Sequence, residues 1–551
     1  MAEAYPATIG GQQVLILKEG ATRTRGKDAQ RSNIMAAKVV AEAVKTSLGP
    51  RGMDKMLVAS FGDVTITNDG ATILKEMEVQ HPAAKMMVEV SKTQDDEVGD
   101  GTTSVVVLAG ELVSKAEELI NKDIHPTIIV DGYRRAQEKA LEILNNLAVK
   151  VDPTDKVTLR KIASISMATK LITESKTALA EIAVDAMLQV SEKTPQGYKA
   201  DVEDVKVEKK AGESMDETRL IQGVVLDKEV VHSGMPKRVQ DAKIALLNSA
   251  LEVEKTEFDA KINIQNPEEM KAFLDEEEKM LRDMVDKVAS SGANVLICQK
   301  GIDDMAQHFL AKKGILAVRR ASEKDMEKLS RASGARITNN LDDLSAKDLG
   351  FAKLVEERKI ADDKMTFIEG CKNPKAVAIL IRGGSQRFVD EAERSLHDAL
   401  CVVRDVIRDP KIVAGGGAIE IELASQLKRW AQTMSGREQL AAFAFAESLE
   451  AIPMALAENA GLDQLDIMVE LRARHEKGEK WMGVDAADGK VADMMKANVI
   501  EPASVKEQIL KSASEAASML LKIDDIVASG KSREGGKPPM PPGGEGSSEF
   551  D

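Results

Sequence analysis

Residues 98–113 read VGDGTTSVVVLAGELV, and this stretch decides how the first part of the chain folds. Asp100 stands between two glycines, three hydroxyl side chains follow, and apolar residues then take over. The apolar residues recur at helical spacing and predict a buried helix that begins at 101–104, with the stripe Val105, Leu108, Ala109, Leu112 and Ala116. The first turn of a helix presents unpaired N–H groups and partial positive charge, so this stretch predicts an anion site.

The carboxylate of Asp100 is the unexpected member of such a site. Glycines let a phosphate approach the backbone and hydroxyls add donors, but a carboxylate repels phosphate unless a cation lies between them. Mg²⁺ typically takes one or two carboxylates together with phosphate oxygens and waters, so Asp100 suggests Mg²⁺. The alternative is that Asp100 only caps the helix, and the local chemistry leaves both interpretations open.

Three other segments are weaker candidates when each is taken alone. Asn68-Asp69-Gly70 follows an alternating strand pattern and is a tight-turn signal. Leu48-Gly49-Pro50-Arg51-Gly52 predicts the stop of a helix that contains Ile34, Ala37, Val40 and Val44. The glycines of 414–417 precede a helical stripe and make a second glycine-rich helix entrance. Each of these patterns is more often structural than functional.

Two charged residues belong to the same class of weak signals. Asp398 lies in a predicted helix, on its polar side with Glu391 and Arg394, where a solvated acid is the ordinary interpretation. Lys170 follows ISMAT and carries no signal by itself. The apolar face of the helix around Asp398 is formed by Val389, Ala392, Leu396, Leu400, Val403 and Ile407.

Composition excludes several classes of function. The 551 residues carry a net charge of −15 and only 3% aromatic residues, which argues against a nucleic-acid or anionic-membrane surface. Apolar runs are short and the N-terminus lacks a signal pattern, so we expect neither a membrane span nor a signal peptide. Three cysteines without CxxC spacing fit a reducing cytoplasm. The chain has no GxxxxGK[ST] and no kinase motifs.

The pattern of helices and strands changes along the chain. Residues up to about 150 and after 411 are mainly helical, whereas 223–375 alternates short strands with helices, as in an α/β domain. Within that region an amphipathic helix is predicted from Asn266, with Met270, Leu274, Leu281, Met284 and Val288 on one stripe. From about 529 the chain is rich in Gly, Pro and Ser and predicts a disordered tail.

Five segments, taken together, closely resemble the group II chaperonins, and archaeal members most of all. They are TSLGPRGMDKML (46–57), TITNDGATIL (65–74), residues 98–113, ERSLHDALCVVR (393–404) and VAGGGAIEIEL (413–423). The resemblance runs from about residue 10 to 528, and the order and spacing of GDGTT and NDG are highly specific. The one visible departure is Val113, where a leucine is expected.

The resemblance implies a multi-domain α and α/β fold threaded discontinuously through three domains. A mostly helical equatorial ATPase domain takes 1–151 and 411–528, and a small intermediate domain takes 152–222 and 376–410. An α/β apical domain takes 223–375 and carries a helical protrusion at about 248–278, which resembles the built-in lid of this group. Residues 529–551 remain a tail.

The resemblance also implies roles for residues that were uninformative singly. Asp100 ligates Mg²⁺ and Lys170 senses the γ-phosphate of ATP. Asp69 and Asp398 position and activate the attacking water. The residues expected to hold or line the nucleotide are Gly49, Gly101, Thr102, Thr103, Ser104 and Gly416, with Glu501 and Lys506 near its ribose and base.

The function implied is that of an ATP-driven protein-folding machine in the cytoplasm. Its partners are unfolded protein clients and copies of this chain or paralogous subunits, assembled as a double ring, with no role for nucleic acid or membrane. One alternative is a small-molecule ATP-dependent enzyme such as a kinase or ligase, for which no acceptor-site residues are found. The other is a non-catalytic ring scaffold, against which the presence of Asp69, Asp100 and Asp398 argues.

Overall fold

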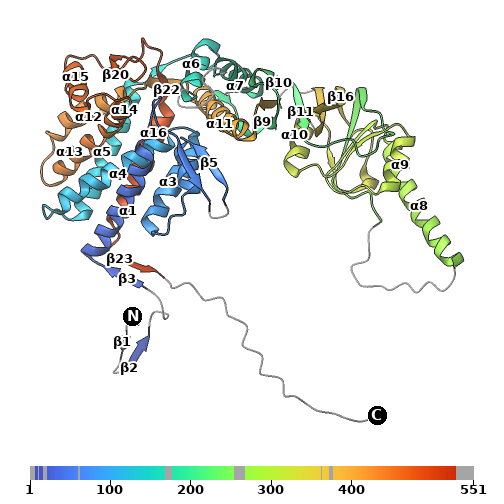
Figure 1. Cartoon of the computed structure of the whole chain (residues 1–551), viewed down its shortest axis with the longest axis horizontal. Coiled ribbons are helices and arrows are strands. Elements are labelled where there is room, and N and C mark those ends of the chain that lie inside the picture. Colours follow the sequence, from blue (N-terminus) through green and yellow to red (C-terminus); the bar gives the residue numbers. More distant parts are fainter. Residues whose placement is uncertain are drawn as a thin grey trace.

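The structure is a computed structural model that describes residues 6–9, 12–15, 22–59, 62–167, 176–195, 197–253, 267–361, 363–371 and 377–528. Its elements form three bodies arranged in a row (Figure 1). We call them the helical body, the middle body and the sheet body. The chain passes through the helical and middle bodies, enters the sheet body, and returns through both.

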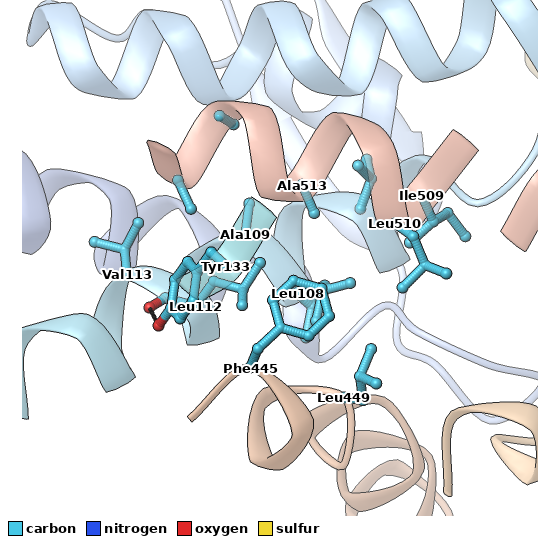
Figure 2. Packing of buried hydrophobic residues seen from close by; sticks show 14 of the residues in the cluster. Leu108, Ala109, Leu112, Val113, Tyr133, Phe445, Leu449, Ile509, Leu510 and Ala513 are labelled. Carbon is cyan, nitrogen blue, oxygen red and sulfur yellow. Dashed lines mark hydrogen bonds between the residues drawn. The ribbon is translucent and has the colours of Figure 1, made fainter. Parts of the chain in front are cut away.

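Among the described residues, the helical body has ten helices. They are α1 (Lys27–Lys45), α2 (Gly70–Glu76), α3 (Pro82–Val98), α4 (Thr102–Ile120), α5 (Pro126–Leu147), α12 (Ala418–Ala431), α13 (Glu438–Ser448), α14 (Ala451–Asn459), α15 (Gln464–Glu476) and α16 (Ala503–Leu521). All of them except α15, whose buried residues form a smaller cluster, contribute to the most extensive hydrophobic core. Helix α4 lies at the centre, where its side chains contact α5, α13 and α16 (Figure 2). The predicted stripe from Val105 to Ala116 is fully buried, and the predicted helix start is confirmed because Gly101 is the N-cap.

Small sheets border the helical body. The pairs are β1 (Pro6–Ile9) with β2 (Gln12–Leu15), β3 (Thr22–Arg25) with β23 (Asp525–Ala528), β4 (Lys55–Val58) with β5 (Val64–Thr67), and β20 (Met482–Asp485) with β21 (Lys490–Asp493). A three-stranded sheet has β19 (Lys411–Ala414) between β22 (Ile500–Pro502) and β6 (Val149–Lys150). The β3–β23 pair joins a strand near the N-terminus to the C-terminal strand of the described chain.

The middle body has its own core, between helices and one face of a sheet. Its helices are α6 (Lys156–Ser166), α7 (Lys176–Val190) and α11 (Gln386–Arg408). Strand β18 (Val377–Gly383) is buried along its whole length between β10 (Arg219–Ile221) and β9 (Val205–Ala211), and β7 (Glu192–Thr194) pairs with β8 (Gly197–Lys199). This body therefore combines segments from both passages of the chain.

The sheet body is a seven-stranded mixed sheet covered by α8 (Pro267–Ser290), α9 (Asp304–Lys312) and α10 (Glu323–Ser333). The strand order is β11 (Gly223–Leu226), β17 (Asp363–Cys371), β16 (Gly350–Ile360), β12 (Arg238–Leu247), β13 (Val295–Cys298) and β14 (Leu316–Val318), with β15 (Ile337–Thr338) beside β12. The predicted alternation of strands and helices is confirmed at β13, α9, β14 and α10. The strands β12, β13 and β14 are parallel, whereas β16 and β17 are antiparallel.

Helix α8 extends away from the sheet body at its N-terminal end (Figure 1). Met270 and Leu274 of the predicted apolar stripe are exposed, whereas Leu281 and Val288 are buried against the sheet body. The predicted protrusion starts later than 248, because Leu251 is buried in this core and bridges to Ile302. Residues 254–266, which include the predicted cap Asn266 and part of the predicted protrusion, lie outside the described residues, as does the tail at 529–551.

Three local predictions from the sequence were wrong. Asn68-Asp69-Gly70 is not a hairpin turn: Asp69 is the N-cap of α2 and accepts a hydrogen bond from the Thr72 N–H. Helix α1 ends at Lys45, three residues before the expected stop. Glu391 is buried rather than solvated, because Arg394 donates two hydrogen bonds to its carboxylate.

The continuous stretch Glu438–Asn459 is long and apolar enough to cross a membrane by length and composition. Of its most apolar window, 72% is buried inside the protein, where α13 and α14 pack on α4, α5 and α12. Burial in the core of the helical body accounts for its apolar character. All three cysteines are free.

A substitution of Phe445 tests the packing of the helical body's core. The Phe445 ring packs edge-on against Tyr133, with 5.7 Å between the ring centroids (Figure 2). Replacing Phe445 by alanine removes a fully buried ring and is expected to cost about 3–5 kcal/mol of stability. Both tryptophans, Trp430 and Trp481, pack against this core, so their fluorescence during denaturant unfolding follows the helical body alone. The control Leu440→Ala, on the exposed face of the same helix, should change stability by less than about 0.5 kcal/mol. Equal losses in both variants would contradict the packing.

Candidate functional site

The first turn of α4 is the centre of the candidate site. Gly99 and Gly101 both adopt left-handed backbone conformations, with φ of 70° and 79°, and present the loop of Asp100 ahead of the helix. The N-cap residue of α4 is Gly101, which has no side chain to cap the helix, and Asp100 accepts a hydrogen bond from the Gly101 N–H at 2.7 Å. A helix start of this kind suits an anion, because its first-turn N–H groups carry partial positive charge.

Asp69 is held against this turn from the side. One of its carboxylate oxygens accepts hydrogen bonds from the Thr72 N–H at 2.9 Å and the Thr72 hydroxyl at 2.7 Å, and the other accepts from the Thr102 hydroxyl at 3.1 Å. Gly70 permits this approach, because a Cβ at that position would lie 2.8 Å from the Thr103 nitrogen. The two helix starts are thus locked together, with Asp69 beside the hydroxyls of α4.

Asp398 reaches the same place from the middle body. Helix α11 crosses the loop at Gly99, where an added Cβ would lie 2.3 Å from the Cβ of Cys401. Arg404 of the same helix donates a hydrogen bond to the Glu97 carbonyl at 2.6 Å. Asp398, one turn before Cys401, is half-buried and lines a small compartment of about 90 Å³ together with Asp69, Asp100 and the hydroxyl residues 102–104.

A larger compartment of about 350 Å³ adjoins the small one. The two share Leu48, Gly49, Asp100, Gly101, Ser104 and Ser166 in their linings. The larger compartment also has apolar walls from Ile452, Leu456, Val499 and Ile509, and a polar end with Glu501 and Lys506. A site of this form takes an elongated ligand with a phosphate end and an apolar end.

The arrangement fits a nucleotide whose phosphates are accompanied by a divalent cation. Within the part of the chain that the structure describes, no group of three or more His, Cys, Asp or Glu residues could hold a metal by itself. Mg²⁺ does not need one, since it typically uses one or two carboxylates and completes its shell with phosphate oxygens and waters. Asp100, next to open N–H groups, is a donor of that kind.

Comparison with known proteins identifies the family. The TCP-1/cpn60 chaperonin family matches residues 40–531. The thermosome subunit of Methanopyrus kandleri is 59% identical over 94% of this chain and 95% of its own length. The chain belongs to this chaperonin family. The thermosome subunits alpha and beta of Archaeoglobus fulgidus are 58% and 57% identical over 98% and 97% of this chain.

A solved group II chaperonin supports the same conclusion for the fold. The open-state monomer from Methanococcoides burtonii is 47% identical and superposes with a TM-score of 0.60, covering 77% of this chain and 100% of its own. The chaperonin is thus multi-domain α and α/β, as the sequence predicts. The relatives give no support to a small-molecule ATP-dependent enzyme, and the chain is an ATP-dependent chaperonin subunit.

Most residues that the sequence singled out in this chaperonin meet at the two compartments. They are Gly49, Asp69, Asp100, Gly101, Thr102, Thr103, Ser104, Asp398, Gly416, Glu501 and Lys506. Lys170 lies outside the described residues. Sequence reasoning missed Ser166, Lys176 and Glu420, because a single serine, lysine or glutamate carries no signal until the fold places it.

The position of Glu420 changes the role that we assign to the charge of Lys506. The buried Lys506 ammonium lies 2.8 Å from Glu420 and 2.7 Å from Glu501, so its charge is used inside the protein. Burial by itself lowers the pKa of Lys506, but the two carboxylates outweigh this and raise its pKa. Burial raises the pKa of Glu501, and Lys506 opposes that rise. The three side chains form an ion cluster that fixes the polar end of the larger compartment.

Lys506→Met should therefore destabilise the helical body by about 3–5 kcal/mol at neutral pH, because it leaves two buried carboxylates without their cation. The pKa of Glu501, which burial already raises, should then rise further, because Lys506 no longer opposes that rise. A carboxyl group whose pKa is higher in the folded than in the unfolded chain destabilises the fold once the pH exceeds its pKa in the unfolded chain, and this penalty disappears as the pH falls toward about 4–5, the ordinary range of glutamate. The difference in thermal midpoint between variant and parent should thus shrink from pH 8 to pH 5.

A matched control lies on the same helix. Lys511→Met removes a half-exposed lysine that is 3.7 Å from Glu507, and it should change the midpoint little at either pH. A deficit in Lys506→Met that stays constant between pH 8 and pH 5 would contradict the ion cluster.

Proposed function

We propose that this chaperonin subunit binds and hydrolyses ATP with Mg²⁺ and uses the cycle to enclose and fold unfolded proteins. The helical body corresponds to the equatorial ATPase domain (1–151 and 411–528), the middle body to the intermediate domain (152–222 and 376–410), and the sheet body to the apical domain (223–375). The observation that carries the proposal is the meeting of Asp69, Asp100 and Asp398, from three chain segments and two bodies, around the first turn of α4.

Each part of the site has a task in this proposal. The N–H groups and hydroxyls of residues 101–104 bind phosphate oxygens, and Gly49 and Gly416 allow the nucleotide to lie against the backbone. Asp100 holds Mg²⁺, which neutralises phosphate charge when bound. The apolar walls receive the base, and Glu501 and Lys506 lie toward the ribose. Lys170 contacts the γ-phosphate.

Hydrolysis requires a positioned water molecule. Asp69 is fixed by three hydrogen bonds and orients that water toward the γ-phosphorus. Asp398 accepts a proton from the water as its oxygen bonds to phosphorus and the bond to the β-phosphate oxygen breaks, giving ADP and inorganic phosphate. Because Asp398 belongs to α11 of the middle body, hydrolysis depends on how the middle body sits on the helical body.

Two acid substitutions separate binding from hydrolysis. Asp100→Ala should weaken nucleotide binding and abolish its dependence on Mg²⁺, whereas Asp398→Ala should bind normally but hydrolyse ATP about 10²–10⁴-fold more slowly. Titration calorimetry and phosphate release measure the two quantities. Asp390→Ala is the control, since this acid on the same helix pairs with Lys209 away from the site, and turnover should stay normal. Unchanged metal dependence in Asp100→Ala, or normal turnover in Asp398→Ala, would remove that residue from its role.

Assembly and client binding complete the proposal. The subunits form two stacked rings in the cytoplasm, from this chain alone or together with paralogues, and clients bind the cavity side of the sheet body. Met270, Phe273 and Leu274 form an exposed apolar group on the projecting part of α8. Methionine adapts to varied apolar partners, and this group supports a role in client capture or closure. A non-catalytic scaffold would need none of the three acids.

The protrusion can be tested without disturbing the ATP site. Replacing residues 254–278 by a short Gly/Ser linker spares the buried Leu251 and Leu281 and every residue of the two compartments. The variant should assemble and hydrolyse ATP but fail to protect an enclosed client from added protease in the presence of ATP. Protection equal to the parent's would show that this segment is no lid, and loss of assembly would show that it belongs to the core.

A further inference from the structure

The larger compartment of the nucleotide site contains two lysines with very different surroundings. Among the residues that the structure describes, Lys176 and Lys506 are the only cations that line it, and the small acid-rich compartment has none. Lys506 is occupied by Glu420 and Glu501. Since a nucleotide brings several negative charges, Lys176 is the cation in the described lining whose charge remains available to it.

Lys176 begins α7 and is half-buried. Within the described ranges its ammonium makes neither a hydrogen bond nor an ion pair, although Asp485 and Glu501 line the same compartment. Burial lowers the pKa of Lys176, and no carboxylate among the described residues compensates for this. A desolvated charge without a partner destabilises the protein that holds it, and such arrangements are typical of binding sites.

We propose that Lys176 donates its ammonium hydrogens to the α- or β-phosphate of the bound nucleotide, and so binds ADP and ATP alike. This rests on the proposed nucleotide site. The position of Lys176 along the nucleotide follows from the residues that line the two compartments. Lys176 lines the larger compartment but not the small one with Asp69 and Asp398, where the γ-phosphate and water react in the proposed mechanism. The two compartments meet at Asp100, Gly101 and Ser104, the place of the inner phosphates.

This contact links two bodies through the ligand. Helix α7 is anchored in the core of the middle body by Leu179, Val184 and Met187, whereas the α4 turn belongs to the helical body. A nucleotide held by both therefore ties the middle body to the helical body before any bond is broken. Because the α- and β-phosphates remain in ADP, this tie persists after hydrolysis, in contrast to any contact with the γ-phosphate.

The test is calorimetric titration of the assembled full-length protein with Mg-ADP and with Mg-ATP. Lys176→Gln should raise both dissociation constants by about tenfold or more, and Lys176→Arg should restore most of the affinity. The salt dependence of binding should be weaker in Lys176→Gln, because one phosphate contact is lost. Lys193→Gln, which removes an exposed lysine of the same body outside the compartments, is the matched control and should bind as the parent does.

Thermal unfolding without nucleotide separates a binding role from a structural one. Because Lys176 has no partner in the described structure, Lys176→Gln should keep or raise the midpoint of the free protein while reducing the shift caused by Mg-ADP. Unchanged affinity for both nucleotides, or a lower midpoint without nucleotide, would overturn the proposal. Loss of ATP affinity with normal ADP affinity would overturn the assignment to the inner phosphates. A parent protein that binds neither nucleotide would instead overturn the proposed function.

Discussion

The site depends on how closely other parts of the chain approach the first turn of α4. A Cβ at position 70 would collide with the backbone of Thr103, one at position 99 with Cys401, and one at position 101 with Ile509. Gly70 belongs to α2, Cys401 to α11 and Ile509 to α16, and these three helices lie far apart in the chain. Glycine at these positions lets three elements converge on one helix start. The convergence brings Asp69 and Asp398 to the loop of Asp100.

The charges around this turn are separated into two groups. The described residues that line the small compartment include three acids and no lysine or arginine, and such a lining suits phosphates only when a divalent cation accompanies them. The larger compartment has one lysine neutralised by two glutamates and one lysine without a described partner. The first lysine holds the two glutamates of the wall together, whereas burial lowers the pKa of the second. A ligand that carries phosphates together with a divalent cation compensates the charges of both compartments.

The packing of the three bodies determines which parts of the protein are connected to the site. Helix α11 contributes Asp398 at one point and packs along the core of the middle body for the rest of its length. The middle body in turn meets the sheet body at a small apolar cluster that includes Phe367 and Leu380. Packed elements therefore connect the candidate site to the sheet body. The exposed apolar residues of α8 stand at the far end of that path.

Much of this could be predicted from the sequence, because local patterns report on local structure. The spacing of apolar residues predicted α4, α11 and the alternating elements of the sheet body, and GDGTT indicated an anion site at a helix start. Where the sequence misled, a tertiary contact overrode a local preference. Asn68-Asp69-Gly70 has the composition of a turn, but the packing of Gly70 on Thr103 makes Asp69 a helix cap. Glu391 is a different case, because it is buried although its ion-pair partner, Arg394, is a local one, three residues along the same helix.

The sequence by itself determined the fold family and the helix that begins at Gly101, and it predicted an anion site at the first turn of that helix, since each follows from short motifs of residues adjacent in the chain. Only the tertiary structure decided which scattered charges act together. Glu420, Glu501 and Lys506 neutralise one another because α12, β22 and α16 pack side by side, whereas Lys176 reaches the compartment without a described partner. No pattern along the chain distinguishes those two lysines. Their difference comes from the dielectric surroundings and the neighbouring charges, and both are set by packing.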